Sequence, residues 1–344
     1  SGWGGIEAHV IALSSELAKR GHDVRVACQP GKFVEAEARK RGLPIAPLTC
    51  RKKHDWASAR SFADVYRRER FDVVHVHGGA DHVVPPFVAR RCGVPAVLMT
   101  RHSPKPLNAV SRYLYGTVCY HHIIAVAEYV RGVLVASGVA PEKVSTIHHG
   151  TDTEAFAPRK MVDKPDDDRL IVGFAGRFVA EKGGDVLLRA LAKCPQTVGV
   201  FFGDGALKDD WQRLAESLGI SDRVRFAGFQ ENIAAALQSV DIFVLPSVWA
   251  EPCAAVVQQA MALEKPVIGT NLGGTPEMIS SDTGLLAPAG DPDALAEAIA
   301  ELAALTPEAR AAMGKRGRER IIARFSLSHM ASETEALYDR LLSP

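Results

Sequence analysis

Charged side chains follow one of the apolar runs in this sequence in a pattern that suits phosphate chemistry. Residues 170–175 form the run, and they are followed by Gly176, Arg177 and, five positions later, Lys182. Arginine binds phosphate oxygens through a planar set of N–H donors, whereas lysine acts as a mobile point charge. Both cations precede a predicted helix, and free N–H groups at a helix start also favour an anion. The loop therefore predicts a diphosphate site, with two solvated loop cations as the alternative.

A second loop combines a carboxylate with a predicted helix start. The apolar run 242–245 leads to Glu251 and Pro252, and we expect Pro252 to be the first residue of the next helix. In that position the helix N-terminus would hold a phosphate while Glu251 accepts hydroxyl groups. The alternative is that Glu251 is an ordinary acidic residue at a helix start.

These loops belong to an alternation of short apolar runs and longer helical stretches. Continuous runs rich in Val, Ile and Leu are typical of parallel strands covered by helices on both faces. Strands are predicted at residues 24–28, 72–77, 96–100, 122–126, 144–147, 170–175, 197–202, 224–226, 242–245 and 266–269. Helices are predicted at residues 7–19, 185–192, 207–217 and 254–263, and after Gly290 at 292–305, 307–324 and 328–342.

The length of 344 residues suits two domains of this α/β class. A polar, proline-punctuated stretch at 158–169 is the predicted linker between a first domain, 1–157, and a second, 170–325. Residues 326–344 form a last helix that we expect to return to the first domain. Doubly wound domains open with a strand, but this chain opens at the Gly-rich turn 2–5, so we expect that the first strand is missing from it.

The charge of the chain is divided unevenly between its halves. Residues 1–160 contain 23 Lys and Arg against 14 Asp and Glu, a balance of +9, whereas the whole chain has a net charge of +1. The basic half suits an anionic partner such as a membrane surface, with candidate contacts at 51–53 and at Arg67, Arg68 and Arg70. A chance excess of solvated cations is the alternative. The acidic remainder argues against nucleic-acid binding.

Composition places the chain among globular proteins. Hydrophobic residues make up 47% and charged residues 24%, which excludes disordered and collagen-like classes. No apolar run reaches the roughly 18–20 residues that span a bilayer, and the start lacks the pattern of a signal peptide. Six cysteines without a C-x-x-C pair indicate a reducing compartment. We therefore expect a cytoplasmic protein that also reaches the inner face of the membrane.

Histidines offer a weaker signal for a metal. His75 and His77 share one face of a predicted strand, which is half of a metal site, but no carboxylate or cysteine is spaced to complete it. The adjacent pairs 121–122 and 148–149 have side chains that diverge. We predict no metal site.

The motifs together resemble the family 4 (group 1) retaining glycosyltransferases of the GT-B fold. Glu251-Pro252 is similar to the start of that family's E-P-x-G…E motif, and residues 271–277 resemble its G-G-x-P-E loop. Residues 4–7 are similar to its G-G-x-E loop, and residues 147–152 stand where the family has a strand and N-G-x-D. The ordered set covers nearly the whole chain. The resemblance implies two Rossmann-like domains that face a cleft, followed by C-terminal helices.

The resemblance also implies roles for individual residues. Arg177 and Lys182 would stabilise the leaving nucleoside diphosphate, Glu251 would bind hydroxyls of the donor sugar, and His102 would reach that sugar across the cleft. The remaining donor-binding positions would be Gly4, Gly5, Gly176, Pro252, Cys253, Ala254, Ala255 and Gln259. Two of them depart from the family pattern: Gln259 replaces a glutamate that holds the ribose, and Ala254 replaces a glycine.

The activity implied by the resemblance is a metal-independent transfer of a sugar with retention of its anomeric configuration. The donor would be a nucleoside-diphosphate sugar, a UDP-sugar rather than a GDP-sugar, and no cofactor is expected. The acceptor would be a glycan, a lipid-linked or a small molecule in cell-envelope polysaccharide or glycolipid synthesis. Two alternatives remain: a sugar-nucleotide epimerase of the same fold, and a non-catalytic nucleotide-sugar-binding subunit.

Overall fold

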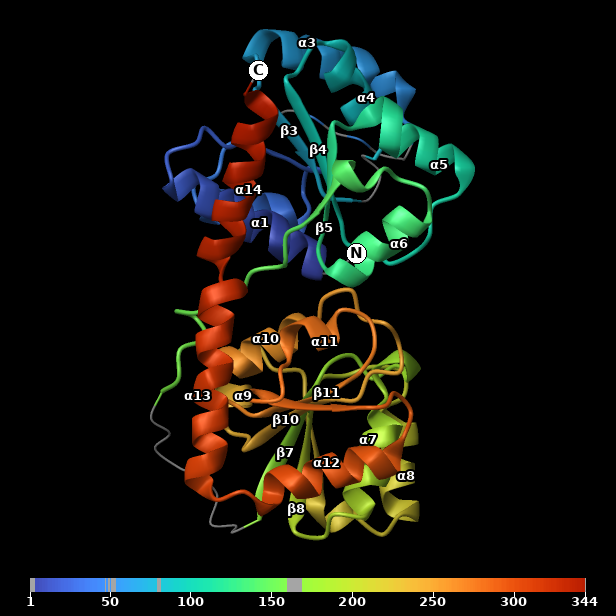
Figure 1. The fold of residues 1–344 in the computed structure, drawn as a ribbon, viewed down its shortest axis with the longest axis vertical. Coiled ribbons are helices and arrows are strands. Elements are labelled where there is room, and N and C mark those ends of the chain that lie inside the picture. Colours follow the sequence, from blue (N-terminus) through green and yellow to red (C-terminus); the bar gives the residue numbers. More distant parts are fainter. Residues whose placement is uncertain are drawn as a thin grey trace. The chain divides into compact units, whose positions relative to one another are not determined.

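The computed structural model describes residues 4–46, 48, 50, 54–78, 82–159 and 169–343. The chain forms two compact units, one of residues 1–150 with 327–344 and one of residues 151–326 (Figure 1). The first unit ends at Gly150 and not at the predicted residue 157, because Thr151 forms a parallel bridge with Ser326 in the second unit. Most of the predicted linker lies outside the described residues.

The second unit contains a parallel sheet of six strands in the order β12-β11-β10-β7-β8-β9. Its strands are β7 (Leu170–Ala175), β8 (Thr197–Phe202), β9 (Val224–Gly228), β10 (Ile242–Leu245), β11 (Val267–Thr270) and β12 (Gly284–Ala287). Five of them were predicted; β12 is a short edge strand that the apolar pattern did not reveal. The direction of winding reverses between the neighbours β7 and β10, and ligands of open α/β sheets bind outside the strand ends at such a point.

Two layers of helices cover this sheet (Figure 1). One layer consists of α7 (Gly184–Ala192), α8 (Lys208–Ser217) and α12 (Pro292–Ala304). The other consists of α9 (Ile233–Gln238), α10 (Ala255–Ala262), α11 (Thr275–Met278) and α13 (Pro307–Arg324). Side chains of β7 alternate between the two resulting cores: Val172 and Phe174 belong to the first, and Ile171 and Ala175 to the second. Both faces are therefore apolar, and the functional side chains come from the loops at the strand ends.

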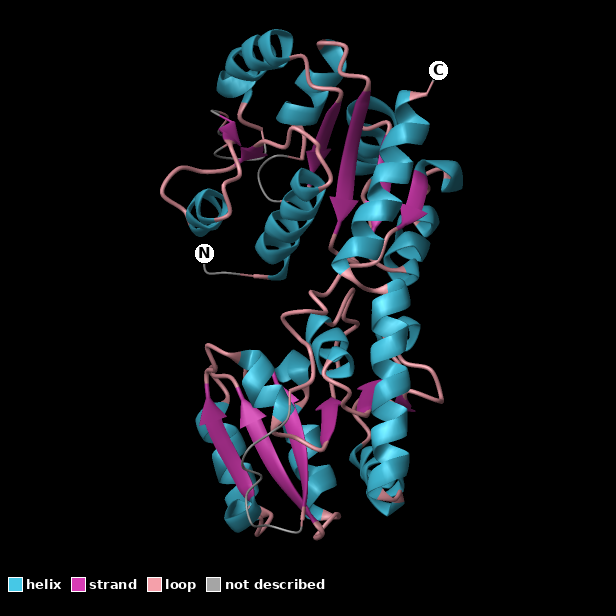
Figure 2. Cartoon of the chain, turned by 90° about the vertical axis from the view of Figure 1, so that its left-hand side faces the viewer, coloured by secondary structure: helices cyan, strands magenta, loops and turns pink. Residues whose placement is uncertain are grey.

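The first unit contains a parallel sheet in the order β3-β4-β5-β6 and a separate parallel pair, β1-β2. The strands are β1 (Val26–Ala27), β2 (Ile45–Ala46), β3 (Val73–Val76), β4 (Ala96–Arg101), β5 (His122–Ala125) and β6 (Val144–Thr146). The helices are α1 (Gly5–Lys19), α2 (Phe33–Lys40), α3 (Ala59–Glu69), α4 (Val84–Arg91), α5 (Ala109–Tyr113), α6 (Glu128–Ala136) and α14 (Leu327–Leu342). The two-residue strand β2 was not predicted. Figure 2 shows helices beside strands throughout both units.

The last helix, α14, belongs to the first unit, as the sequence led us to expect. It packs with α1 over β4, where Leu13, Leu98 and Met330 contribute to one buried cluster. Among the described residues, no helix combines the length and the apolar character needed to cross a membrane.

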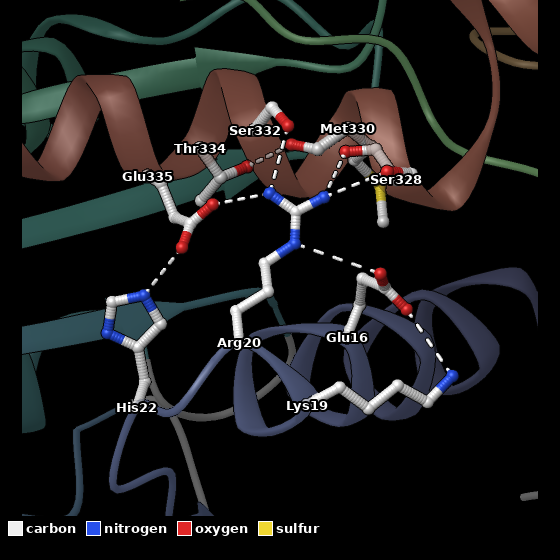
Figure 3. Close-up of polar contacts among 9 residues, drawn as sticks. All are labelled: Glu16, Lys19, Arg20, His22, Ser328, Met330, Ser332, Thr334 and Glu335. Carbon is white, nitrogen blue, oxygen red and sulfur yellow. Dashed lines mark hydrogen bonds and ion pairs between the residues drawn. The ribbon is translucent and has the colours of Figure 1, made fainter.

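Polar contacts add to this packing between α1 and α14 (Figure 3). Arg20, which follows α1, donates from Nη2 to the carbonyl oxygen of Ser328 at 2.7 Å and from Nη1 to Ser332 Oγ at 2.9 Å. The same guanidinium also pairs with Glu335, whose second carboxylate oxygen lies 2.8 Å from His22 Nε2. Hydrogen bonds from His22 and Arg20 hold the pKa of Glu335 below its usual value. One arginine thus ties the start of the unit to its C-terminal helix.

We predict that Arg20→Ala lowers the unfolding free energy of the first unit by about 1 kcal/mol, because several charge-assisted hydrogen bonds at a half-exposed site are lost. The destabilisation should shrink in acid, since the stabilising contribution of a carboxylate with a depressed pKa is present near neutral pH and is lost as the pH falls through that pKa. Urea unfolding at pH 7 and pH 3 measures both effects. Lys19→Ala is the control, because Lys19 is exposed and its ion pair is with Glu16 on its own helix. An equal loss in both variants would contradict the prediction.

Candidate functional site

The loops that follow β7 and β10 meet through a charged contact in the second unit. Lys182 ends a 3-10 turn, Ala180–Lys182, and its Nζ lies 2.6 Å from Glu251 Oε1. Ser247 Oγ donates to the same oxygen at 2.9 Å. Both charged side chains are largely shielded, with 20% and 13% of their surface exposed. The structure therefore brings together a predicted diphosphate cation and the predicted sugar-binding carboxylate at the point where the sheet reverses its winding.

Backbone contacts hold these two loops in place. The N–H of Val248 donates to the carbonyl oxygen of Glu181 at 3.0 Å. Gly183, between Lys182 and α7, has a φ of 65°, and a Cβ at this position would lie 2.1 Å from the carbonyl oxygen of Pro246. Only glycine permits this close approach without a shift of the backbone. Lys182 is thus positioned by a rigid junction and not by a free loop.

Arg177 lies in the same loop with a solvent-exposed side chain. Within the described part of the chain, its guanidinium has no hydrogen bond or ion pair. The preceding residue, Gly176, is closely packed: its N–H donates to Phe202 O at 3.0 Å, and a Cβ on Gly203 would lie 1.9 Å from its carbonyl oxygen. The backbone is therefore fixed while the guanidinium stays available to a ligand.

The start of α10 differs from the prediction. Pro252 is not the first helical residue, because α10 begins at Ala255. A helix that started at Pro252 would need the carbonyl oxygen of Glu251 as an acceptor, but that oxygen accepts a bond from the N–H of Gly274 at 2.8 Å. A Cβ on Gly273 would lie 2.4 Å from the same oxygen. Glu251 is thus held by the loop after β11, and it does not directly precede the first turn of α10 as predicted.

The predicted glycines of the first unit lie at the N-terminus of α1. Gly4 is the N-cap, and Gly5 is the first helical residue. A Cβ added to Gly5 would contact nothing within 4 Å, so the fold itself leaves open space beside this glycine. The helix start lies next to the loop after β3, because a Cβ on Gly78 would lie 3.7 Å from Ile6 Cδ1. This open, N–H-bearing end can accept an anion.

His102 belongs to a cluster of imidazoles in the first unit. Its ring centroid lies 4.8 Å from that of His9, which is in turn 5.2 Å from the rings of His77 and His149. Burial lowers the pKa of His102 to about 3 and that of His149 to about 4, and it lowers the pKa of His9 well below its usual value. His9 was not predicted as a site residue, because its spacing from the other histidines carries no signal, and no role was predicted for His149.

Comparison with known proteins decides the family. Residues 3–155 match the family described as Glycosyltransferase Family 4, and residues 159–320 match Glycosyl transferases group 1. The chain belongs to the group 1 glycosyltransferases.

Curated relatives and solved structures agree with this assignment. The glycosyltransferase is 28% identical over 338 residues to a lipopolysaccharide core biosynthesis glycosyltransferase of Rhizobium meliloti, with 94% of this chain and 92% of the relative covered. It is 28% identical over 382 residues to a D-inositol 3-phosphate glycosyltransferase of Mycolicibacterium paratuberculosis, with 98% of this chain and 86% of the relative covered.

Solved structures show the fold. A glycosyltransferase from Rickettsia africae superposes with a TM-score of 0.89 at 20% identity, covering 99% of this chain and 96% of the other. HepE from Anabaena, determined in complex with UDP, superposes with a TM-score of 0.85 at 19% identity, covering 99% and 98%. The α/β architecture is that of the GT-B glycosyltransferases.

The two departures of this glycosyltransferase from the family motif have different structural settings. The methyl group of Ala254 is 4% exposed and belongs to the core beneath α10, so it is not presented to a ligand. Gln259 lies on α10 with a partly exposed side chain, whereas its neighbour Gln258 is buried and accepts a hydrogen bond from Thr151. Cys253 and Ala255, which flank Ala254, are both half-buried. Of the two departures, only Gln259 can alter contacts with a ligand directly.

We predict that Gly183→Ala destabilises the second unit far more than Gly219→Ala. Both glycines have a φ near 65°, but only Gly183 would place its Cβ against backbone, and Gly219 has open space around it. Gly219→Ala is the control and should lose about 1 kcal/mol of unfolding free energy, because alanine is strained in the left-handed backbone conformation. Gly183→Ala should lose about 3 kcal/mol or more, because its Cβ also meets the backbone. Urea unfolding of both variants measures the difference, and equal losses would show that the junction does not fix the Lys182 loop.

Proposed function

We propose that this glycosyltransferase transfers a sugar from a nucleoside-diphosphate donor, a UDP-sugar rather than a GDP-sugar, with retention of configuration. The supporting observation is the contact between Lys182 and Glu251 at the winding reversal of the second sheet, with the exposed Arg177 in the same loop. HepE, which shares the fold, was determined in complex with UDP and with UDP-glucose. A cation pair beside a carboxylate suits a diphosphate joined to a hydroxyl-rich sugar.

Catalysis in this proposal is stabilisation of the leaving group. As the bond to the anomeric carbon breaks, negative charge grows on the diphosphate, and Arg177 and Lys182 bind that charge more tightly than they bind the intact donor. Glu251 holds the Lys182 ammonium before the donor arrives and accepts sugar hydroxyls afterwards. The acceptor attacks from the side of the departing diphosphate, whose oxygen takes the acceptor proton, and this same-face path retains the configuration.

Two side-chain cations replace the divalent ion that would otherwise neutralise a diphosphate. We therefore expect the transfer to need neither Mg²⁺ nor Mn²⁺ and no organic cofactor. His102 keeps its predicted role of contacting the donor sugar, and Gly4 and Gly5 keep theirs beside the donor phosphate, where the open N-terminus of α1 suits an anion.

The acceptor in our proposal is a glycan or a lipid-linked molecule of the cell envelope. The named activities of the two curated relatives, in lipopolysaccharide core biosynthesis and on inositol 3-phosphate, support an anionic or glycan acceptor. Exposed Arg67, Arg68 and Arg70 at the end of α3 suit attraction to an anionic membrane surface at the cytoplasmic face. The second predicted basic cluster, residues 51–53, lies outside the described residues.

Labelled donor incubated with and without candidate acceptors tests the reaction class. Label in the acceptor with the configuration retained supports the transferase. Release of an epimerised free sugar without acceptor would instead identify an epimerase, and donor binding without turnover would identify a binding subunit, an alternative that the loss of the family glutamate at position 259 favours.

We predict that Arg177→Ala and Lys182→Ala each reduce kcat by about 10²-fold, because each removes a donor that stabilises charge in the transition state. Steady-state kinetics with a fixed acceptor measures the loss. Lys193→Ala is the matched control: this exposed lysine follows α7 at the opposite end from Lys182 and pairs with Asp293. Turnover near the wild-type rate in the Arg177/Lys182 double variant would contradict the proposal that these two residues bind the diphosphate.

We also predict that Gln259→Glu tightens donor binding several-fold with little change in kcat. A carboxylate accepts both ribose hydroxyls through charge-assisted hydrogen bonds, whereas an amide offers only one acceptor oxygen. This gain should exceed the repulsion from the more distant diphosphate. Calorimetry with donor measures the effect, and Gln259→Ala, which removes both bonds, should bind more weakly than wild type. Weaker binding by Gln259→Glu would mean that the site is built around glutamine.

A further inference from the structure

Three imidazoles converge at one end of the first sheet. His77 follows β3, His102 follows β4, and His9 lies on α1, one turn after the glycine-rich start. One ring nitrogen from each of these three residues lies within 4.8 Å of those of the other two. They come from three separate segments of the chain, so the convergence is produced by the fold and not by local sequence.

Each ring also has a buried nitrogen with no hydrogen-bond partner among the described residues: His9 Nε2, His77 Nδ1 and His102 Nε2. A buried polar atom without a partner costs roughly 1–3 kcal/mol, so such atoms are rare in native proteins and need an explanation. Three of them in one cluster suit a common partner that accepts lone pairs, such as a metal ion.

The neighbouring histidines differ from these three because their nitrogens are occupied. His75 Nδ1 lies 2.6 Å from Tyr338 Oη, and its Nε2 lies 2.7 Å from Thr100 Oγ1. His149 Nδ1 lies 2.9 Å from His9 Nδ1. When His9 Nδ1 donates in that contact, its Nε2 carries a lone pair, which is how second-layer groups orient a metal-binding histidine.

We propose that His9, His77 and His102 form a binding site for a transition-metal ion of the zinc type, with one coordination position left open. Imidazole nitrogen suits Zn²⁺, whereas Mg²⁺ and Mn²⁺ prefer oxygen ligands, so a set of three histidines favours an ion of the zinc type. Tetrahedral Zn–N bonds of about 2.0–2.1 Å separate neighbouring nitrogens by about 3.4 Å, so separations of up to 4.8 Å would close by at most about 1.4 Å.

The surroundings fit this assignment. Burial lowers the pKa of the three histidines, which keeps their imidazoles neutral, the form that binds a metal. His9 is fully enclosed, while His77 and His102 retain partial exposure, so an ion can enter from their side. A metal bond uses one ring nitrogen of His102 and leaves the second for the sugar contact that the family resemblance implies.

The experiment is a Zn²⁺ titration of the metal-free protein of 344 residues without donor or acceptor, so that its result is independent of the proposed transferase activity. We expect one equivalent to bind. X-ray absorption of the zinc-loaded wild type should show three nitrogen neighbours of histidine type, and Co²⁺ should give the absorption bands of a tetrahedral complex. Absence of stoichiometric binding by wild-type protein, or oxygen-only coordination, would overturn the proposal without reference to any variant.

Substitutions then test the ligand set. His9→Ala, His77→Ala and His102→Ala should each weaken Zn²⁺ binding by about 100-fold or more, since even second-layer changes cost 10–100-fold. His122→Gln is the control, because His122 is buried in the same unit, as His9 is, but its Nε2 is engaged with Ser145 Oγ at 2.8 Å. Unchanged affinity in a folded variant of any of the three proposed ligands, checked by circular dichroism, would contradict this ligand set.

Discussion

The contact between Lys182 and Glu251 is the interaction on which our account of the second unit depends. It joins the loops of two strands that are neighbours in the sheet but 72 residues apart at their starts, from β7 at Leu170 to β10 at Ile242. Shielded from water, the ammonium and the carboxylate attract each other strongly, yet each retains hydrogen-bonding capacity for a ligand. The Lys182–Glu251 pair is thus balanced in charge, and in our account an arriving diphosphate competes with Glu251 for Lys182.

Glycines make this contact rigid, because the absence of a side chain lets the backbone segments of the two loops approach closely. Gly183 and Gly273 both adopt positive φ angles and bring backbone oxygens of Pro246 and Glu251 closer than any Cβ would allow. The loops are consequently preorganised, so that little reorganisation is needed when charge develops on a bound diphosphate. Two helical layers, each with its own core, hold the strands beneath them.

The sequence predicted the parts of this architecture that depend on local pattern. The continuous apolar runs of β7, β8 and β10 gave strand bounds that the structure reproduces, and the rule that ligands bind at strand ends placed Arg177, Lys182 and Glu251 correctly in loops. Features set by distant contacts were missed. Pro252 lies outside α10 because Gly274 occupies the Glu251 carbonyl. β2 has only two residues, and β12 is an edge strand whose central Leu285 and Leu286 are not buried, so neither forms the continuous apolar run of a buried strand. The histidine cluster depends on a contact between His9 and His149, 140 residues apart, which no spacing reveals.

The most direct test of the account is a crystal structure of the protein with UDP bound. We expect the diphosphate oxygens within hydrogen-bond distance of Arg177 and Lys182, with the Lys182 ammonium drawn from Glu251 towards phosphate. A diphosphate bound at another end of the sheet, or bound here with the Lys182–Glu251 contact unchanged and Arg177 turned away, would contradict it.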